Sequence, residues 1–154
     1  PWVASGYYGL SQIPGSEGCP VDELGWFDTG DVATINPQGY MRITDRTKDV
    51  IKTGGEWVSS IEIENAAVSH PDVAEAAAIG RYHPKWTERP LLVVVRKADT
   101  SVSSEQIITF LQSKLHKLSM PDDIVFVDEL PHTATGKLNK LALRKTLENY
   151  QFPA

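Results

Sequence analysis

Residues 56–79 read EWVSSIEIENAAVSHPDVAEAAAI, and this stretch decides the fold class. Its first three residues predict a short strand, and the following Ser-Ser-Ile-Glu is typical of a capping box that begins a helix. The helix is expected to reach about Val68, where His-Pro-Asp ends it. The apolar run over residues 73–79 then predicts a buried strand. The stretch is therefore a β-α-β unit.

A second unit of the same kind follows. Residues 81–90 are rich in charged residues and predict a loop, which leads to a β-branched strand over residues 91–96. Ser103 and Gln106 predict a capping box for a second helix, which Pro121 is expected to close. The apolar residues at helical spacing are Ile107, Ile108, Leu111, Leu115 and Leu118.

The remaining segments complete the predicted order. A strand over residues 124–127, a polar loop over 131–137 and a last helix capped by Asn139 follow one another. From residue 56 to 127 the order is β-α-β-β-α-β. We therefore predict an α+β fold in the order βαββαβα, with an open-faced, three-stranded mixed sheet flanked by helices on one side.

The first 55 residues are dominated by turn residues. Glycines and prolines predict that residues 1–25 form a loop. Residues 32–35 and 40–44 flank Asn-Pro-Gln-Gly and predict a β-hairpin. A short strand over residues 49–51 is expected before the Gly-Gly break at 54–55.

Composition excludes several classes of protein. The net charge of −5 argues against a general nucleic-acid binder. The apolar runs are far shorter than the roughly 20 residues that cross a bilayer, and no basic-then-apolar stretch opens the sequence, so we expect neither a signal leader nor a transmembrane segment. Cys19 is the only cysteine, and no His or Cys pair has zinc-ligand spacing, so we expect no metal site and a reducing, cytoplasmic setting.

Three short motifs occur in order, and each alone is typical of a turn or loop. They are Thr-Gly-Asp at 29–31, Asp-Arg-Thr-Lys-Asp at 45–49 and Pro-His-Thr-Ala-Thr-Gly-Lys at 131–137. The last is not a nucleotide-binding P-loop, because residue 131 is Pro and residue 138 is Leu. Together, GWFDTGDVATINPQGYMRITDRTKDVIKTGGEWVSSIEIE and ELPHTATGKLNKLALRK closely resemble the adenylate-forming superfamily of acyl-CoA synthetases, luciferases and peptide-synthetase adenylation domains.

The resemblance covers nearly the whole chain and implies a division of it. Residues 1–45 would be the last segment of a large N-terminal AMP-binding domain, and residues 46–154 a mobile C-terminal lid. Because the chain begins with Pro1 and the family's acyl pocket lies in the large domain, we interpret it as a fragment that is inactive alone. GGEWVSSIEIE and VASGYYG look most similar to medium-chain fatty acyl-CoA ligases.

The reaction implied by the resemblance has two steps. A carboxylic acid attacks the α-phosphate of ATP to give acyl-AMP, and the thiol of CoA then displaces AMP. Mg²⁺ would be bound mainly by the N-terminal domain, which is the expected protein partner; a homo-oligomer is left open. Lys137 matches the catalytic lysine, whose charge would offset repulsion between the two anions. Acylation of Lys137 would remove that charge and stop adenylation.

Other positions match further roles of the family. Asp31 matches the residue that binds the ribose hydroxyls, and Arg46 is expected to donate to the same sugar and phosphate region. Lys48 occupies the hinge position, where a backbone torsion change swings the lid between two poses.

The Gly-Gly break is expected to serve the second step. Gly54 and Gly55 would let the narrow pantetheine chain of CoA approach the backbone, and Glu56 and Trp57 could line its path. Trp57 is equally interpretable as a core or interdomain aromatic residue. Lys52 resembles a lysine that some relatives use in thioester formation.

One position departs from the family, and two alternatives stay open. Lys140 stands where the family often has Arg, which keeps the charge but weakens bidentate contacts. The same lid motifs occur in adenylation domains that load a carrier protein and in luciferase-like enzymes. The strand order is also used by non-catalytic ligand-binding modules.

Overall fold

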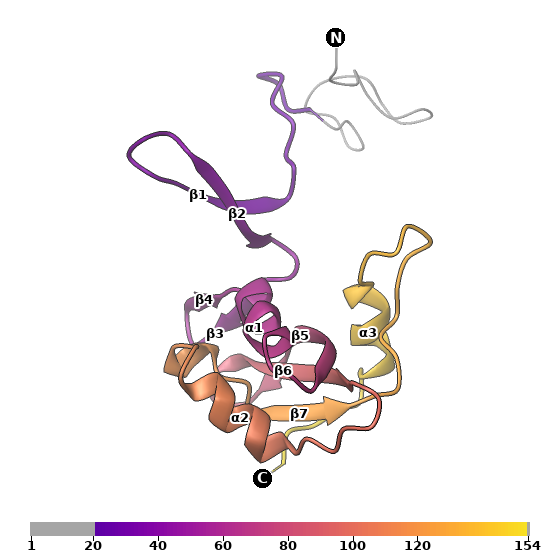
Figure 1. Cartoon of the computed structure of the whole chain (residues 1–154). Coiled ribbons are helices and arrows are strands. Elements are labelled where there is room, and N and C mark those ends of the chain that lie inside the picture. The colour runs from indigo at the N-terminus through magenta and orange to yellow at the C-terminus, as the bar shows by residue number, and fades with distance from the viewer. Residues whose placement is uncertain (1–20, 154) are drawn as a thin grey trace. The chain divides into compact units, whose positions relative to one another are not determined.

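The computed structural model describes residues 21–153 (Figure 1), and the chain divides into two units after Asp31. In the described part of the first unit, a bridge pairs Val21 with Phe27, and the Asp22 side chain accepts hydrogen bonds from two backbone N–H groups. Most of the loop predicted over residues 1–25 lies outside the described residues, as does Cys19.

The expected hairpin is confirmed. It pairs β1 (Asp31–Ile35) with β2 (Met41–Arg46) in a two-stranded sheet. The Asn36 side chain accepts from the backbone N–H groups of Gln38 and Tyr40, and this fixes the turn.

The main sheet is mixed, so the α+β class is confirmed, but it has five strands rather than three. The strand order is β4-β3-β6-β5, and β7 pairs with β6 in parallel while the other pairs are antiparallel. The strands are β3 (Ile51–Thr53), β4 (Glu56–Val58), β5 (Val73–His83), β6 (Thr87–Arg96) and β7 (Asp123–Phe126). The short strands β3 and β4 join the sheet because Thr53 pairs with Thr87 at the start of β6.

The loop predicted over residues 81–90 was wrong, because both flanking strands extend into it. Strand β5 continues to His83 and β6 begins at Thr87, so only a tight turn separates them. Gly80 pairs with Pro90 inside this ladder. Proline lacks an N–H, but the Pro90 carbonyl accepts from Asp122, so its polar group is satisfied. Continuous pairing between β5 and β6 therefore outweighs the tendency of Gly80 and Pro90 to end a strand.

Three helices form where the caps predicted them to begin. They are α1 (Ser60–Val68), α2 (Ser104–Gln112) and α3 (Lys140–Thr146), capped by the side chains of Ser59, Ser103 and Asn139. The capping box of α2 is complete. Helix α2 nevertheless ends at Gln112, not near Pro121, and a 3-10 turn spans Lys117–Ser119. Leu115 lies beyond the end of the helix but is buried. Its spacing from Leu111 therefore indicated a buried position and not a longer helix.

Helices cover both faces of the sheet, so the open-faced prediction was wrong. On one face, Ile63 of α1 and Ile107 of α2 pack with Leu92 and Val94 of β6. On the other face, Leu143 of α3 packs with residues of β5 and β6 that point the opposite way, because successive side chains of a strand alternate between its faces. These alternate residues are Ala77, Ile79, Leu91 and Val93. Leu143 is the buried residue of α3, and its burial contributes about 1.5–3 kcal/mol to holding the helix on the sheet.

Candidate active site

A groove of about 570 Å³ lies in the second unit, and three segments line it. They are residues 45–49, part of α1, and residues 133–144. The groove brings together three residues that the sequence singled out, Arg46, Lys48 and Lys137. Its charged lining consists of Arg46, Lys48, Lys137, Lys140, Arg144, Asp45, Asp49 and Glu64. Basic residues outnumber acidic ones, so the groove suits an anionic ligand.

Lys137 lies at the end of a tight loop. The backbone N–H of Thr133 donates to the Lys137 carbonyl at 2.8 Å, and the Lys137 N–H donates to the Thr133 hydroxyl at 3.2 Å. Gly136 has a φ of +77°, a left-handed conformation that favours glycine. The Lys137 side chain is exposed and forms no ion pair with a described residue, so its ammonium can meet a ligand.

Asp45 fixes the opposite wall of the groove. The residue is 1% exposed, and its carboxylate accepts from the Ser60 N–H at 2.5 Å and the Ser60 hydroxyl at 2.8 Å. It also accepts from the N–H of Arg46 at 2.7 Å. A buried carboxylate needs such donors. These bonds fix the backbone immediately before Arg46 and Lys48.

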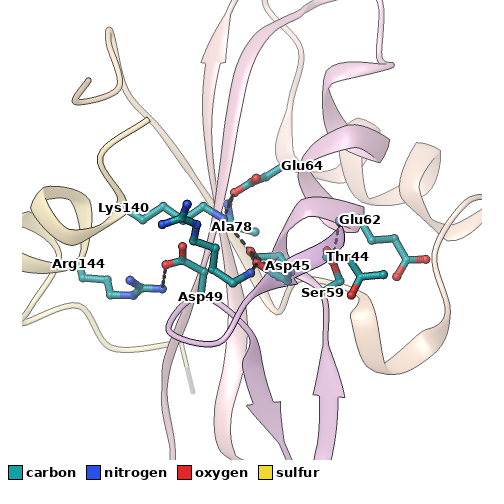
Figure 2. A network of polar contacts seen from close by, with 11 residues as sticks. Thr44, Asp45, Asp49, Ser59, Glu62, Glu64, Ala78, Lys140 and Arg144 are labelled. Atoms are coloured by element: carbon teal, nitrogen blue, oxygen red, sulfur yellow. Dashed lines mark hydrogen bonds and ion pairs between the residues drawn. The ribbon is translucent and has the colours of Figure 1, made fainter. Parts of the chain in front are cut away.

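Two ion pairs join α3 to the rest of the groove. Lys140 lies 2.7 Å from Glu64 and donates to the Ser60 hydroxyl at 2.6 Å, and Arg144 lies 2.8 Å from Asp49. Figure 2 shows Lys140 and Arg144 extending from α3 toward these carboxylates. Burial raises the pKa of Glu64, and the charge of Lys140 opposes that rise.

The predicted CoA-binding residues cluster apart from the groove lining, at the β3–β4 turn. Lys52 pairs with Trp57 across the two strands, and its ammonium lies 5.4 Å from the centre of the Trp57 indole, within cation–π range. Trp57 is 60% exposed and Glu56 is exposed, so Trp57 is not a core residue of this unit.

The two glycines of this turn have different surroundings. Gly54 has a φ of +57°, and a Cβ there would lie 2.7 Å from the Trp86 ring. Gly55 has a φ of +91°, and a Cβ there would meet nothing within 4 Å. Open space for a ligand is therefore found beside Gly55, whereas Trp86 fills the space beside Gly54.

The chain is similar to known proteins over most of its length. Residues 62–137 match the family model described as AMP-binding enzyme C-terminal domain. The chain belongs to this family. It is 51% identical to 3-methylmercaptopropionyl-CoA ligase of Ruegeria lacuscaerulensis and 43% identical to medium-chain-fatty-acid–CoA ligase of Ectopseudomonas oleovorans. These matches cover 93% and 94% of the chain, and 25% of each relative.

A solved structure agrees with this assignment. The crystal structure of ATP-bound MatB from Rhodopseudomonas palustris superimposes with a TM-score of 0.78 and 36% identity, over 84% of this chain and 26% of MatB. The chain thus spans about a quarter of the length of the proteins it matches.

The Thr-Gly-Asp motif lies outside the residues that match the family model and forms the turn before β1. The Asp28 side chain accepts from the Gly30 N–H at 2.8 Å, and the Thr29 hydroxyl accepts from the Asp31 N–H at 3.2 Å. Asp31 is the last residue of the first unit, and its proposed role in ribose binding stays a prediction.

The sequence missed the polar network that holds the domain's groove together. Asp45, Ser60 and Glu64 were not singled out, although Ser60 and Glu64 are four residues apart on α1 and therefore share a face. Lys140 and Arg144 have the same spacing on α3. These two spacings of four residues were the sequence pattern that could have indicated the network.

The described residues contain neither a candidate metal-binding cluster nor a candidate membrane-spanning helix. Within residues 21–153, no group of three or more His, Cys, Asp or Glu side chains is placed to hold a metal ion. In the same range, none of the helices has the length and apolar character that a membrane span requires.

Proposed function

We propose that the protein containing this chain is an AMP-forming acid–CoA ligase. The decisive observation is the groove that joins exposed Lys137 to Arg46 and Lys48. Three cations from segments about 90 residues apart in sequence meet there, as a reaction between two anions requires. The names of the relatives, both CoA ligases, support the same class of reaction.

In the first step, a carboxylate oxygen of the acid bonds to the α-phosphorus of ATP, and the bond from that phosphorus to the bridging oxygen breaks. The products are acyl-AMP and pyrophosphate. Lys137 would offset the repulsion between carboxylate and phosphate and the charge that develops on the phosphate oxygens. Its exposed side chain on a tight loop supports this role, because the loop fixes the backbone while the stem can reach the ligand.

Arg46 and Asp31 would bind the nucleotide. The planar guanidinium of Arg46 suits phosphate and sugar oxygens, and the Asp31 carboxylate can accept from ribose hydroxyls. Arg46 lines the groove beside Lys48, the proposed hinge residue. A torsion change at Lys48 would then move the lid between a pose for each step.

In the second step, the CoA sulfur attacks the acyl carbon, AMP leaves, and the thiol proton is released. The β3–β4 turn would receive the pantetheine chain at Gly55, where the space is open. Lys52, Glu56 and exposed Trp57 would border this path. Gly54 would have a structural role, because its missing side chain leaves room for the Trp86 ring.

The rest of the active site would lie in a larger N-terminal domain that includes residues 1–45. The β1–β2 hairpin would contact the rest of that domain, since its Ile35, Tyr40 and Met41 are 71%, 75% and 65% exposed. Such a group of exposed apolar side chains marks an interface. That domain would bind most of the Mg²⁺·ATP and the acid, as the family resemblance implies. Residues 46–154 would be the lid, inactive alone.

The proposed acid is a medium-chain fatty acid, and the proposed compartment is the cytoplasm. The test uses a protein extended to the length of its relatives. We expect acid-dependent exchange of pyrophosphate into ATP, thioester formation with free CoA, and highest kcat/KM for acids of medium chain length. Exchange without CoA thioester, but with loading of a carrier protein, would replace the ligase proposal with a carrier-loading one. Absence of acid-dependent exchange would reject adenylation itself.

A further inference from the structure

We propose that Lys140 is a positioning residue for adenylation, because it joins the helix that follows Lys137 to the buried Asp45–Ser60 pair on the opposite wall of the groove. This inference rests on the proposed function. It assigns Lys140 no contact with substrate.

The contacts of Lys140 connect the two walls directly. Its ammonium donates to the Ser60 hydroxyl at 2.6 Å, and that hydroxyl lies 2.8 Å from a carboxylate oxygen of Asp45. A serine hydroxyl has one proton to donate and can accept at the same time, so a relay from Lys140 through Ser60 to Asp45 satisfies all three groups. Asp45 in turn accepts from the N–H of Arg46. The network therefore runs from α3 to the backbone of a cation that lines the groove.

Glu64 holds Lys140 in this orientation. The two charges are 2.7 Å apart, with side chains 10% and 15% exposed, and Glu64 also accepts from the Ala78 N–H at 2.8 Å. A buried ion pair adds little net stability compared with apolar residues of similar size, and in some proteins such pairs specify one arrangement of the groups around them. We therefore assign the pair to positioning rather than to stability.

The short connection from Lys137 to Lys140 transmits this geometry. Only Leu138 and Asn139 lie between them, and the Asn139 side chain caps α3 through the Ala142 N–H. The Asn139 N–H donates to the Pro131 carbonyl at 2.7 Å, which closes the Lys137 loop on itself. Loop and helix therefore move together. A displacement of about 1 Å at a reacting group can cost about 100-fold in rate.

The effect should be confined to the first step. Lys137, Arg46 and Lys140 line the groove, whereas the proposed thioester residues lie at the β3–β4 turn. Loosening the Lys140 contacts therefore displaces Lys137 from the groove and leaves the turn intact.

The test compares half-reactions in the full-length protein. Lys140→Met combined with Glu64→Gln removes both buried charges, and the amide oxygen introduced at position 64 can still accept from the Ala78 N–H. We expect kcat for acid-dependent pyrophosphate exchange to fall about 10- to 100-fold, in line with displacement of a reacting group. Thioester formation from supplied acyl-AMP should be retained. Lys140→Arg should retain both steps, and Lys145→Met, an exposed lysine of α3, should match the unchanged protein.

Other results would overturn the assignment. Equal loss in both half-reactions would show that Lys140 only maintains the fold, and unchanged exchange would show that it positions nothing. If the double variant does not fold, Ser60→Ala breaks the relay alone and must reproduce the selective loss. Lys137→Ala separates the two proposals. If it abolishes exchange while the double variant does not, only the positioning role fails; if the unchanged protein has no exchange, the proposed function fails.

Discussion

The indole of Trp86 occupies the space that a side chain at Gly54 would need. A Cβ at Gly54 would lie 2.7 Å from Cε3 of the ring, and the Gly54 N–H donates to the Trp86 carbonyl at 2.8 Å. The β5–β6 turn and the β3–β4 turn are thus locked together through one glycine. Any side chain at position 54 must displace the indole as well as adopt a left-handed backbone.

Gly54→Ala is therefore predicted to destabilise the fold more than Gly55→Ala. Both changes place alanine at positive φ, at a cost of roughly 1–2 kcal/mol, but only the first adds overpacking of about 1–3 kcal/mol. Urea denaturation of the two variants measures the difference. Equal free energies of unfolding would mean that the Trp86 ring moves aside without cost.

Arg89→Met should cost about 1.5–3 kcal/mol, as expected when hydrogen bonds of a charged group are removed and one partner is partly exposed. The Arg89 guanidinium is paired with Asp122 at 2.6 Å and donates to the carbonyls of Leu118 and Met120. It thus holds the segment that leads into β7. Lys117→Met is the matched control, because Lys117 is exposed in the same segment. Similar midpoints for the two variants in urea would contradict the assignment.

The sequence predicted the order of elements well and their extents less well. The caps at Ser59, Ser103 and Asn139 were found because capping is local: each side chain bonds a backbone N–H three residues ahead. The β5–β6 pairing was underestimated because Gly80 and Pro90 are breakers only until they face each other in a ladder. This pairing is a tertiary contact, and it leaves no pattern in the sequence around either residue.

The site shows the same limit. Motifs identified Lys137, Arg46 and Lys48, and all three line the same groove, while their roles stay predictions. The pair Lys140–Glu64 joins residues 76 positions apart, and nothing in either neighbourhood specifies the other. The five-stranded extent of the sheet and its covered second face were missed for a related reason, since strand pairing and the packing of Leu143 are tertiary.

The pH dependence of stability should reveal the buried state of Glu64. Burial raises its pKa in the folded protein above the value of about 4.3 found in an unfolded chain, although Lys140 and the Ala78 N–H oppose the rise and nearby Asp45 adds to it. The folded state therefore binds this proton more tightly. The contribution of Glu64 to the free energy of unfolding should be greatest below about pH 4 and fall as pH rises through the raised pKa.

Comparison with Glu64→Gln isolates this contribution. The free energy of unfolding of the unchanged protein minus that of the variant should decrease between about pH 4 and neutrality, and Lys140→Met should make the decrease steeper. Urea denaturation at a series of pH values gives the curve. An increase with pH would show that Lys140 outweighs burial and that the pKa of Glu64 is lowered instead.

The most direct test of the account is Lys137→Ala in the full-length protein, with the two half-reactions measured separately. Without the ammonium, acid-dependent pyrophosphate exchange should fall by a factor of about 10² to 10³, as for loss of other groups that stabilise developing charge. Thioester formation from supplied acyl-AMP and CoA should be retained. If exchange survives the substitution, Lys137 is an ordinary loop lysine, and the groove is not the adenylation site.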